Sequence, residues 1–184
     1  MIDSNQSMFN FMNTDAPVLD SPKALDIKRI RAVTACNLNK EWHSRLPIIQ
    51  WSNVVRNTHY VCYGAYHGSV YYAVGIWSSP VAQNRFENGR TLLELRRLAI
   101  RDEAPKYTAT WMIAKMIKDI RLLFPDIKKL ISYQDTEVHK GTIYKASNWF
   151  VDGESEGLSW TTAERARNPD QTTAKKIRWA YLLI

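Results

Sequence analysis

Residues 92–149 decide the fold of this chain, and they read LLELRRLAIRDEAPKYTATWMIAKMIKDIRLLFPDIKKLISYQDTEVHKGTIYKASNW. The run from Leu92 to Ile100 is largely apolar and short enough to be a strand. Charged residues and a proline break it over 102–106, and apolar side chains spaced three and four apart then follow. These side chains are Trp111, Met112, Met116, Ile117, Ile120, Leu123 and Phe124. The spacing predicts an amphipathic helix with one face on a core and the other in solvent.

Further signals bound this helix and continue the chain beyond it. The hydroxyl of Thr108 or Thr110 can cap the helix start, because a side-chain oxygen accepts a backbone N–H left unpaired in the first turn. Pro125 closes the helix, and the segment KLISY from Lys129 to Tyr133 predicts a second strand, followed by a polar corner and a short helix. A strand, a crossover helix and a second strand predict a βαβ unit with parallel pairing.

The residues before this unit add strands to it. The runs Tyr60–Tyr66 (YVCYGAY) and Val70–Trp77 (VYYAVGIW) are rich in aromatic and β-branched residues and are separated by HGS. They predict a hairpin that leads into the strand at Leu92, so that three strands run in succession and are expected to be antiparallel. Residues 24–40 suit a helix or a strand that leads into a helix, and the period does not separate the two.

The residues after this unit close the domain. The chain is expected to turn through Asp152 and Gly153, to stay polar until Ala174 and to end in a strand over 175–184. We therefore expect one α/β domain over 24–184, with a mixed sheet of antiparallel N-terminal strands, a central βαβ core and flanking helices. Residues 1–23 are expected to be a loosely ordered lead-in or a strap over the domain surface.

Composition narrows the class of protein. A chain of 184 residues with 45% hydrophobic and 23% charged residues fits one globular domain. It has no apolar run long enough for a membrane helix and no signal-peptide pattern, which predicts a cytoplasmic location and no membrane partner. Cys36 and Cys62 are expected to be reduced, buried thiols. The net charge of +7 suits a phosphate-rich partner or simply a soluble basic protein, and charge alone leaves both open.

Motifs for the commonest chemistries are absent from the sequence. The four histidines lack metal-ligand spacing, and there is no nucleophile elbow, phosphate loop or dinucleotide fingerprint. What remains is the strand end SYQD, where alternation places Tyr133 and Asp135 on one face and Ser132 and Gln134 on the other. An Asp there can orient or deprotonate an amine, and a Tyr can return a proton to a thiolate. The alternative is that Asp135 caps the following turn and His139 contacts only backbone.

Two other features suit ligands. The start of the predicted helix, with Lys106 and the threonine hydroxyls, can bind an anion, although a plain capped helix explains the same residues. Aromatic residues near Arg45 and Lys140 can stack on an unpaired base, although most aromatic residues must lie in the core.

Three motifs taken together resemble a known family. They are ELRRL (94–98), SYQD (132–135) and HKGTIY (139–144), the last leading to Ala146 and Trp149. Their layout resembles the acetyl-coenzyme A core of the GNAT acyltransferases and, more closely, the Mom DNA-modification family. The resemblance implies conversion of adenine in double-stranded DNA to an N6-acetamido (carbamoylmethyl) adenine, which protects bacteriophage DNA from host restriction. It implies that acetyl-CoA is the donor and that the adenine is extruded from the base stack. It also suggests an iron requirement, with unknown ligands, and a homodimer.

The resemblance also implies roles for individual residues. The cofactor-binding set is Leu98, Ala99, Ile100, Lys106, Tyr107, Thr108, Thr110 and Tyr144. The catalytic set is Asp135, Tyr133, His43 and His139, and the DNA-binding set is Arg45, Arg97 and Lys140. The sequence departs from the family pattern twice. The glycine-rich pyrophosphate loop of GNAT proteins is replaced by Ala104–Thr108 (APKYT), and the usual His-Tyr-Ser is shortened to His43-Ser44.

Two other functions fit the same residues. A conventional GNAT N-acetyltransferase acting on a small amine or a protein keeps the acetyl-CoA site without needing DNA. A non-catalytic nucleic-acid-binding module uses the same basic surface and predicts salt-sensitive DNA binding that is indifferent to acetyl-CoA.

Overall fold

The computed structural model describes residues 16–42, 47–80, 89–155 and 174–183. Within these residues the strands form a seven-stranded sheet in the order β1-β2-β3-β4-β5-β7-β6. The strands are β1 (Asp26–Arg29), β2 (Tyr60–His67), β3 (Val70–Ser78), β4 (Leu92–Ile100), β5 (Lys129–Asp135), β6 (Phe150–Ser155) and β7 (Lys176–Leu182). The helices are α1 (Ala32–Trp42), α2 (Trp51–Val55), α3 (Thr108–Leu123) and α4 (Thr142–Ala146). Short 3-10 turns span Pro22–Ala24 and Gly89–Thr91.

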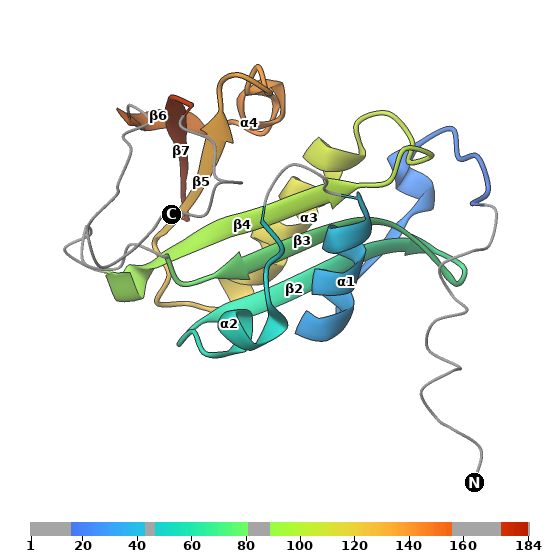
Figure 1. Ribbon diagram of the computed structural model, residues 1–184, viewed down its shortest axis with the longest axis horizontal. Helices are drawn as coiled ribbons and strands as arrows, with labels where there is room; N and C mark the ends of the chain where they lie inside the picture. The colour runs from blue at the N-terminus through green and yellow to red at the C-terminus, as the bar shows by residue number, and fades with distance from the viewer. Residues whose placement is uncertain (1–15, 43–46, 81–88, 156–173, 184) are drawn as a thin grey trace, which may run out of the picture.

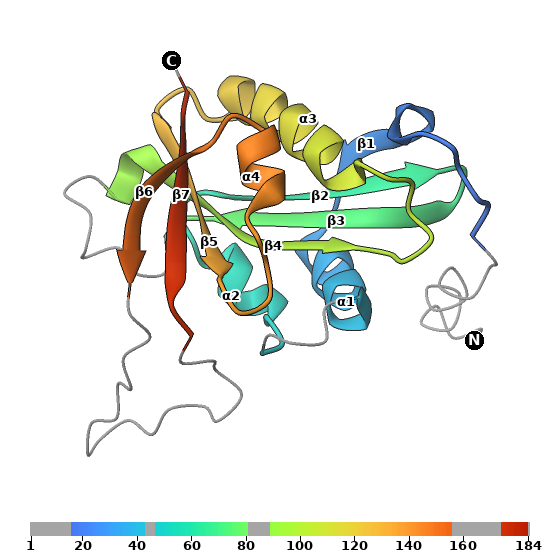
Figure 2. The same ribbon diagram turned by 90° about the horizontal axis from the view of Figure 1, so that it is seen from above.

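The sheet is mixed, with helices on both faces (Figure 1, Figure 2). Strands β1 to β4 pair antiparallel, β4 pairs parallel with β5, and β7 pairs antiparallel with both β5 and β6. Helices α3 and α4 lie on one face of the sheet, and α1 and α2 lie on the other (Figure 2). The predicted βαβ unit, hairpin and mixed sheet are therefore confirmed. No helix among the described residues is long and apolar enough to span a membrane.

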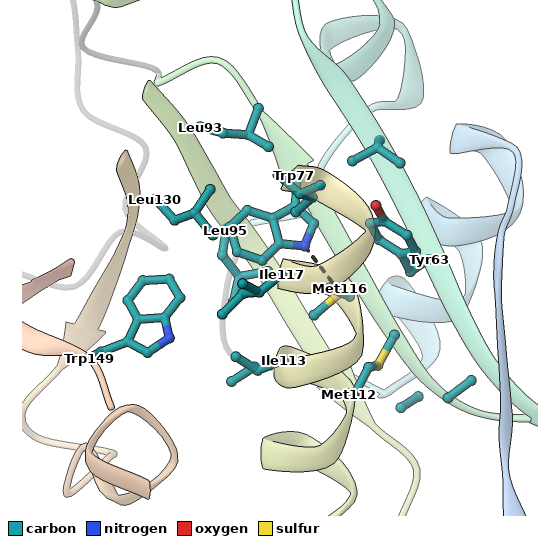
Figure 3. Packing of buried hydrophobic residues seen from close by; sticks show 14 of the residues in the cluster. Tyr63, Trp77, Leu93, Leu95, Met112, Ile113, Met116, Ile117, Leu130 and Trp149 are labelled. Atoms are coloured by element: carbon teal, nitrogen blue, oxygen red, sulfur yellow. Dashed lines mark hydrogen bonds between the residues drawn. The ribbon is translucent and has the colours of Figure 1, made fainter. Parts of the chain in front are cut away.

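Helix α3 buries the apolar stripe that its sequence predicts. Met112, Met116 and Ile120 are fully buried against the sheet, and the indole N–H of Trp77 donates to the Met116 sulfur at 3.1 Å (Figure 3). A Cβ at Gly75 would lie 2.5 Å from that sulfur, so glycine allows the helix to approach β3 closely. This packing fixes the position of the helix that follows β4.

A second core on the α1 and α2 face contains both cysteines. Cys36 and Cys62 are buried and unpaired, as expected for reduced thiols. Burial and the nearby Cys36 raise the pKa of Cys62 to about 12. Neither thiol is therefore ionised at neutral pH, and the pair serves packing.

The last third of the chain departs from prediction. Residues 150–155 form strand β6, although Asp152 and Gly153 were expected to make a turn. The register between β6 and β7 shifts between Val151 and Gly153, which leaves Asp152 as an extra residue. A bulge of this kind lets a strand contain the Asp-Gly pair that in a short loop would indicate a turn. The predicted final strand is confirmed as β7.

The segment before β1 runs against the domain. The Pro17 carbonyl accepts a hydrogen bond from the buried Tyr72 hydroxyl at 2.7 Å, and Leu19 packs against the main core. The boundary at residue 24 stays a prediction.

Asp119 ties the first strands to helix α3. Its carboxylate accepts two hydrogen bonds from Arg29 of β1, at 2.7 and 2.8 Å, and one from the Tyr63 hydroxyl of β2 at 2.7 Å. Hydrogen bonds from Arg29 and then Tyr63 lower the pKa of Asp119 despite its partial burial. Burial and the neighbouring carboxylate raise the pKa of Tyr63.

We expect Asp119→Ala to lower the free energy of unfolding by about 1.5–3 kcal/mol, because the buried Tyr63 hydroxyl loses a charged acceptor. A third of the Asp119 side chain is exposed, so solvent screens its ion pair and the Tyr63 contact dominates. Because the folded pKa of Asp119 is depressed, its stabilisation is full above the unfolded pKa of about 3.9 and is lost as pH falls through the folded pKa. Urea unfolding at neutral and acidic pH measures both effects. Tyr63→Phe is the control with a smaller loss, and equal stability of Asp119→Ala and wild type would contradict the prediction.

Candidate active site

Strands β4 and β5 separate partway along their length. Their parallel pairing runs from Leu92 and Lys129 to Leu95 and Ser132. Beyond this point β4 stays paired with β3 as far as Ile100, whereas β5 stays paired with β7 as far as Asp135. The two strands consequently diverge, as both views of the sheet show (Figure 1, Figure 2). The gap between them, which we call the wedge, has its apex at Leu95 and Ser132.

A bulge in β4 begins at the apex. Trp77 of β3 pairs with Leu95 and Ile76 pairs with Arg97, which leaves Arg96 as the extra residue. Bulges bend a strand and increase its local twist, which accounts for β4 turning away from β5 here. The cofactor-binding residues predicted on this strand, Leu98, Ala99 and Ile100, lie beyond the bulge and pair with β3 on one edge. The other edge of β4 faces the wedge.

Tyr144 reaches the apex from helix α4. Its hydroxyl lies 2.9 Å from the Ser132 Oγ, and Ser132 in turn donates to the Leu95 carbonyl at 3.1 Å. A serine has one hydroxyl proton, so Tyr144 is the donor to Ser132. Burial raises the pKa of Tyr144, although the Ser132 hydrogen bond opposes the shift. The site thus has a buried phenol that is protonated at neutral pH, at the point where β4 and β5 separate.

The surroundings of Tyr144 fix its position. Its ring stacks on Trp179 of β7, with centroids 5.5 Å apart and planes 14° apart. The Trp179 N–H donates to Gln134 Oε1 at 2.7 Å, and the Gln134 amide donates to the His139 carbonyl. Gly141, with φ of 70°, precedes the helix, and a Cβ there would lie 2.5 Å from Gln134 Oε1. Gly141 is therefore required both for its conformation and for its small size.

The start of helix α3 differs from the predicted cap. Thr108 and Thr110 donate their hydroxyls to the carbonyls of Pro105 and Tyr107, at 2.6 and 3.0 Å, instead of accepting N–H groups. Tyr107, at the N-cap position, has φ of 72° and makes no side-chain cap hydrogen bond. The left-handed region is costly for a residue with a Cβ. The prediction of a threonine cap is wrong, and the strained backbone at Tyr107 turns the chain into the helix.

The wedge and this helix start suit acetyl-CoA. The edge of β4 beyond Leu95 can pair with an extended chain that contains amides, and the start of α3 can bind phosphate. Lys106 is exposed beside the helix start, with its amine 5.1 Å from the Tyr107 ring centroid. The APKYT segment therefore enters the helix through a left-handed turn at a tyrosine.

Tyr133 and Asp135 lie on the opposite face of β5 from Ser132 and Gln134, as alternation predicts. Tyr133 is 37% exposed, whereas Ser132 and Gln134 are buried. Asp135 accepts a hydrogen bond from the Glu137 N–H at 3.0 Å, and its carbonyl accepts one from the His139 N–H at 3.0 Å. The turn-capping geometry considered for Asp135 is thus present. The His139 side chain is exposed.

The two described residues that were predicted to contact DNA differ in their exposure to solvent. Lys140 is exposed in the corner before α4. Arg97 is half-buried, and its guanidinium donates to the carbonyls of Arg96 and Pro47 at 2.7 and 3.1 Å. Burial, with Arg96 nearby, lowers the pKa of Arg97. Arg45, and with it the predicted catalytic residue His43, lies outside the described residues. All of these roles stay predictions.

The described residues contain no group of three histidine, cysteine, aspartate or glutamate side chains that could hold a metal ion. These residues alone therefore do not form an iron site, and we derive no step through iron.

The sequence alone did not identify Asp152 and Arg178 as a pair. Arg178 donates to the Asp152 carboxylate at 2.7 Å from the neighbouring strand. The Asp-Gly pair predicts a turn at 152–153. The expected sheet therefore lacked strand β6, and with it the contact between Asp152 and Arg178. The bulge interrupts the alternation of side chains along FVDGES. No local sequence pattern could therefore have revealed the pairing of Asp152 with Arg178.

We expect Tyr107→Gly to stabilise the protein by up to about 1 kcal/mol. Removing the left-handed strain gains about 1–2 kcal/mol, and the flexibility of glycine in the unfolded chain returns part of it. Because Tyr107 is 67% exposed, loss of its side chain removes little packing. Thermal unfolding measures the change, with Tyr107→Ala as the control that keeps the strain. A destabilised glycine variant would show that the ring itself holds this turn.

The chain is similar to known proteins in both sequence and structure. A model of the Mom protein family matches residues 24–180. No protein among curated sequences matches. The structure is similar to an acetyltransferase of the GNAT family from Streptococcus pneumoniae, with 9% identity, a TM-score of 0.60, and coverage of 86% of this chain and 98% of that chain.

Two further solved structures have the same architecture. The N-acetyltransferase from Staphylococcus aureus Mu50 has 10% identity and a TM-score of 0.63, with 86% of this chain and 97% of that chain covered. YncA from Salmonella typhimurium, whose structure was solved with its cofactor acetyl-CoA, has 8% identity and a TM-score of 0.61, with 88% and 95% covered. Similarity at these identities shows the fold, which is that of the GNAT acetyltransferases, as predicted.

Proposed function

The chain belongs to the Mom protein family, and on this premise we propose that it is a transferase that modifies adenine in DNA with a group derived from acetyl-CoA. The observation that carries the proposal is the wedge between β4 and β5, with a protonated tyrosine at its apex and the start of α3 following the end of β4 in the chain. The product implied by the family is N6-acetamido adenine, whose biological role is to protect bacteriophage DNA from host restriction.

The donor site uses backbone more than side chains. Leu98, Ala99 and Ile100 would pair with the pantetheine arm through the edge of β4 that faces the wedge. The turn at Tyr107 and the first turn of α3 would hold the pyrophosphate, with the Lys106 amine adding positive charge. When bound, acetyl-CoA supplies an acetyl group as an activated thioester.

Two side chains divide the proton transfers. Tyr144, on the α3 and α4 face, would protonate the departing thiolate, because burial keeps its hydroxyl protonated at neutral pH. This geometry supports Tyr144 in that role better than Tyr133, which lies on the opposite face. Asp135 lies on the Tyr133 face and would orient or deprotonate the exocyclic amine of adenine. Its hydrogen bond to Glu137 would hold the carboxylate in place.

Formation of the acetamido product requires reactants that ordinary acetylation does not. Transfer of an acetyl group to the adenine amine releases coenzyme A and balances without another reactant. Attachment through the methyl carbon with a terminal amide needs a nitrogen donor and a two-electron oxidant in addition. An iron centre is one source of that oxidation, and its ligands would have to include residues outside the described set.

A conventional N-acetyltransferase is the second candidate. The wedge and Tyr144 serve acetylation of a small amine or a protein equally well, and one similar structure is a ribosomal-protein-S18-alanine N-acetyltransferase from Escherichia coli. The net charge of +7 suits DNA as an acceptor and disfavours a cationic polyamine, whereas it does not separate DNA from other anionic acceptors.

Nucleoside mass spectrometry tests the proposal. The protein is co-expressed with a plasmid, and the recovered DNA is digested to nucleosides. We expect a deoxyadenosine heavier by C2H3NO for the acetamido group, or by C2H2O for an acetyl group. DNA from cells that express Tyr144→Phe is the matched control. Unmodified deoxyadenosine, together with acetylation of a polyamine or peptide by the purified protein, would support the second candidate instead.

A further inference from the structure

Strands β5, β7 and β6 place three residues in one row on the sheet face opposite α4. Across β5, β7 and β6, Tyr133 pairs in register with Arg178, and Arg178 with Gly153. Opposite residues in paired strands project from the same face, so Tyr133 and Arg178 are side-chain neighbours. Gly153 has no side chain to cover them, and a Cβ there would lie 3.2 Å from Arg178 Nη2. The Arg178 side chain therefore lies across the strand instead of projecting into solvent.

Several hydrogen bonds hold Arg178 in this position. Its Nε donates to Asp152 Oδ2 at 2.7 Å, and its Nη2 donates to the Asp152 carbonyl at 3.1 Å. Burial would lower the pKa of Arg178, but hydrogen bonds with Asp152 and the Tyr133 hydroxyl raise it instead. Asp152 also pairs with Lys129 at 2.5 Å, so the carboxylate is fixed by two cations. These hydrogen bonds fix the orientation of a planar group that can stack on aromatic rings.

Exposure to solvent increases from Asp152 to Arg178 to Tyr133. The Asp152 side chain is 14% exposed and the Arg178 side chain 31%, and Tyr133 is 37% exposed. The acceptor carboxylate is thus below the surface, while the guanidinium and the phenol are at the surface. A partly exposed ion pair of this kind contributes little to stability.

The position of this pair relates it to the wedge. Tyr133 directly follows Ser132, the apex residue of β5, and shares a strand face with Asp135. A ligand on Tyr133 and Arg178 therefore lies next to the proposed base and one residue from the point where the donor strand separates. Aromatic rings and arginine planes are the groups on which unpaired bases stack.

We propose that Tyr133 and Arg178 form a stacking platform for the purine base of a nucleotide extruded from DNA, with Asp152 positioning Arg178. The inference rests on the proposed function, and it gives Tyr133 a binding role in place of proton transfer. The hydroxyl of Tyr133 then serves to align the ring with Arg178.

Substitutions at Tyr133 separate stacking from proton transfer. Tyr133→Leu removes the ring and is expected to raise the KM for DNA about 10- to 100-fold, the range of one lost base stack, with the KM for acetyl-CoA unchanged. Tyr133→Phe keeps the ring and is expected to raise it only a few-fold. Asp152→Asn and Arg178→Lys are each expected to raise the KM for DNA about 3- to 10-fold. The first weakens the contact that orients the guanidinium, and the second replaces the planar guanidinium by an ammonium group. Leu122→Ala, on the exposed side of α3, is the control that leaves the KM unchanged.

A binding assay provides a readout that is independent of catalysis. A single-stranded oligonucleotide that contains 2-aminopurine loses fluorescence when the base stacks on a protein ring. We expect quenching by wild type and Tyr133→Phe, and markedly less by Tyr133→Leu. Equal quenching and equal KM for Tyr133→Leu and wild type would overturn the platform. Equal losses of activity in Tyr133→Phe and Tyr133→Leu would overturn it too, because the hydroxyl would then be the group that matters. If wild type leaves plasmid adenine unmodified, the proposed function fails and the quenching series alone judges the platform.

Discussion

Tyr144→Phe is expected to lower kcat about 100- to 1,000-fold while leaving the fold intact. The substitution removes only the hydroxyl, and loss of a positioned general acid costs a factor in this range. The ring stack on Trp179 and the contact with Trp149 are retained, so stability should change little. Release of coenzyme A thiol by the purified protein measures the rate, and thermal unfolding checks the fold.

Controls for Tyr144 come from the hydrogen-bond chain at the apex. Ser132→Ala removes the acceptor of the Tyr144 hydroxyl and is expected to lower kcat about 10-fold, the cost of roughly one hydrogen bond. Because the pKa of Tyr144 is raised above its usual value near 10, the phenol stays protonated across the neutral range. The rate should therefore show no loss from this group until the pH exceeds that value. A kcat for Tyr144→Phe within threefold of wild type would remove Tyr144 from the chemistry.

Asp135→Asn is expected to lower kcat/KM for DNA at least 100-fold without unfolding the turn that follows β5. Asparagine keeps an oxygen that can accept the Glu137 N–H, so the structural role of the side chain survives. It lacks the negative charge that a base for the adenine amine requires. Modified deoxyadenosine in digested DNA measures the activity.

The comparison with Asp135→Ala separates the two roles of this residue. Alanine removes the charge and the turn cap together, so it should lose both activity and some stability. Equal activity of Asp135→Asn and wild type, with loss in Asp135→Ala alone, would mean that Asp135 only caps the turn. Donor binding provides a further check, because acetyl-CoA affinity should be the same in wild type and Asp135→Asn.

Prediction from sequence succeeded where one element could be identified by its own residues. The spacing of Met112, Met116 and Ile120 predicts α3 because a helix with one buried face needs apolar residues at that period. Alternation along β5 likewise separates Ser132 from Tyr133 by face. The aromatic and β-branched hairpin strands are identified in the same way, from side chains that suit a pleated surface.

Prediction from sequence failed where the same residues are compatible with two different local structures. Asp152 and Gly153 form a turn in a short loop and a bulge in an edge strand, and only pairing with β7 distinguishes these outcomes. Thr108 is a good cap residue, yet its hydroxyl donates to Pro105, because the left-handed Tyr107 sets a different path into the helix. Both differences come from contacts or backbone angles that residue type alone does not specify.

The sequence by itself determined the central βαβ unit, the antiparallel strands before it and the alternation that separates the two faces of β5. Each depends on periodicity within a few turns or one strand. The tertiary structure decided which tyrosine reaches the apex of the wedge and which arginine lies beside Tyr133. Those two outcomes depend on the register of β5 against β7 and on α4 packing over Trp179, which join residues far apart in the chain. Long-range register is set by the packing of the whole sheet, so no local stretch of sequence contains it.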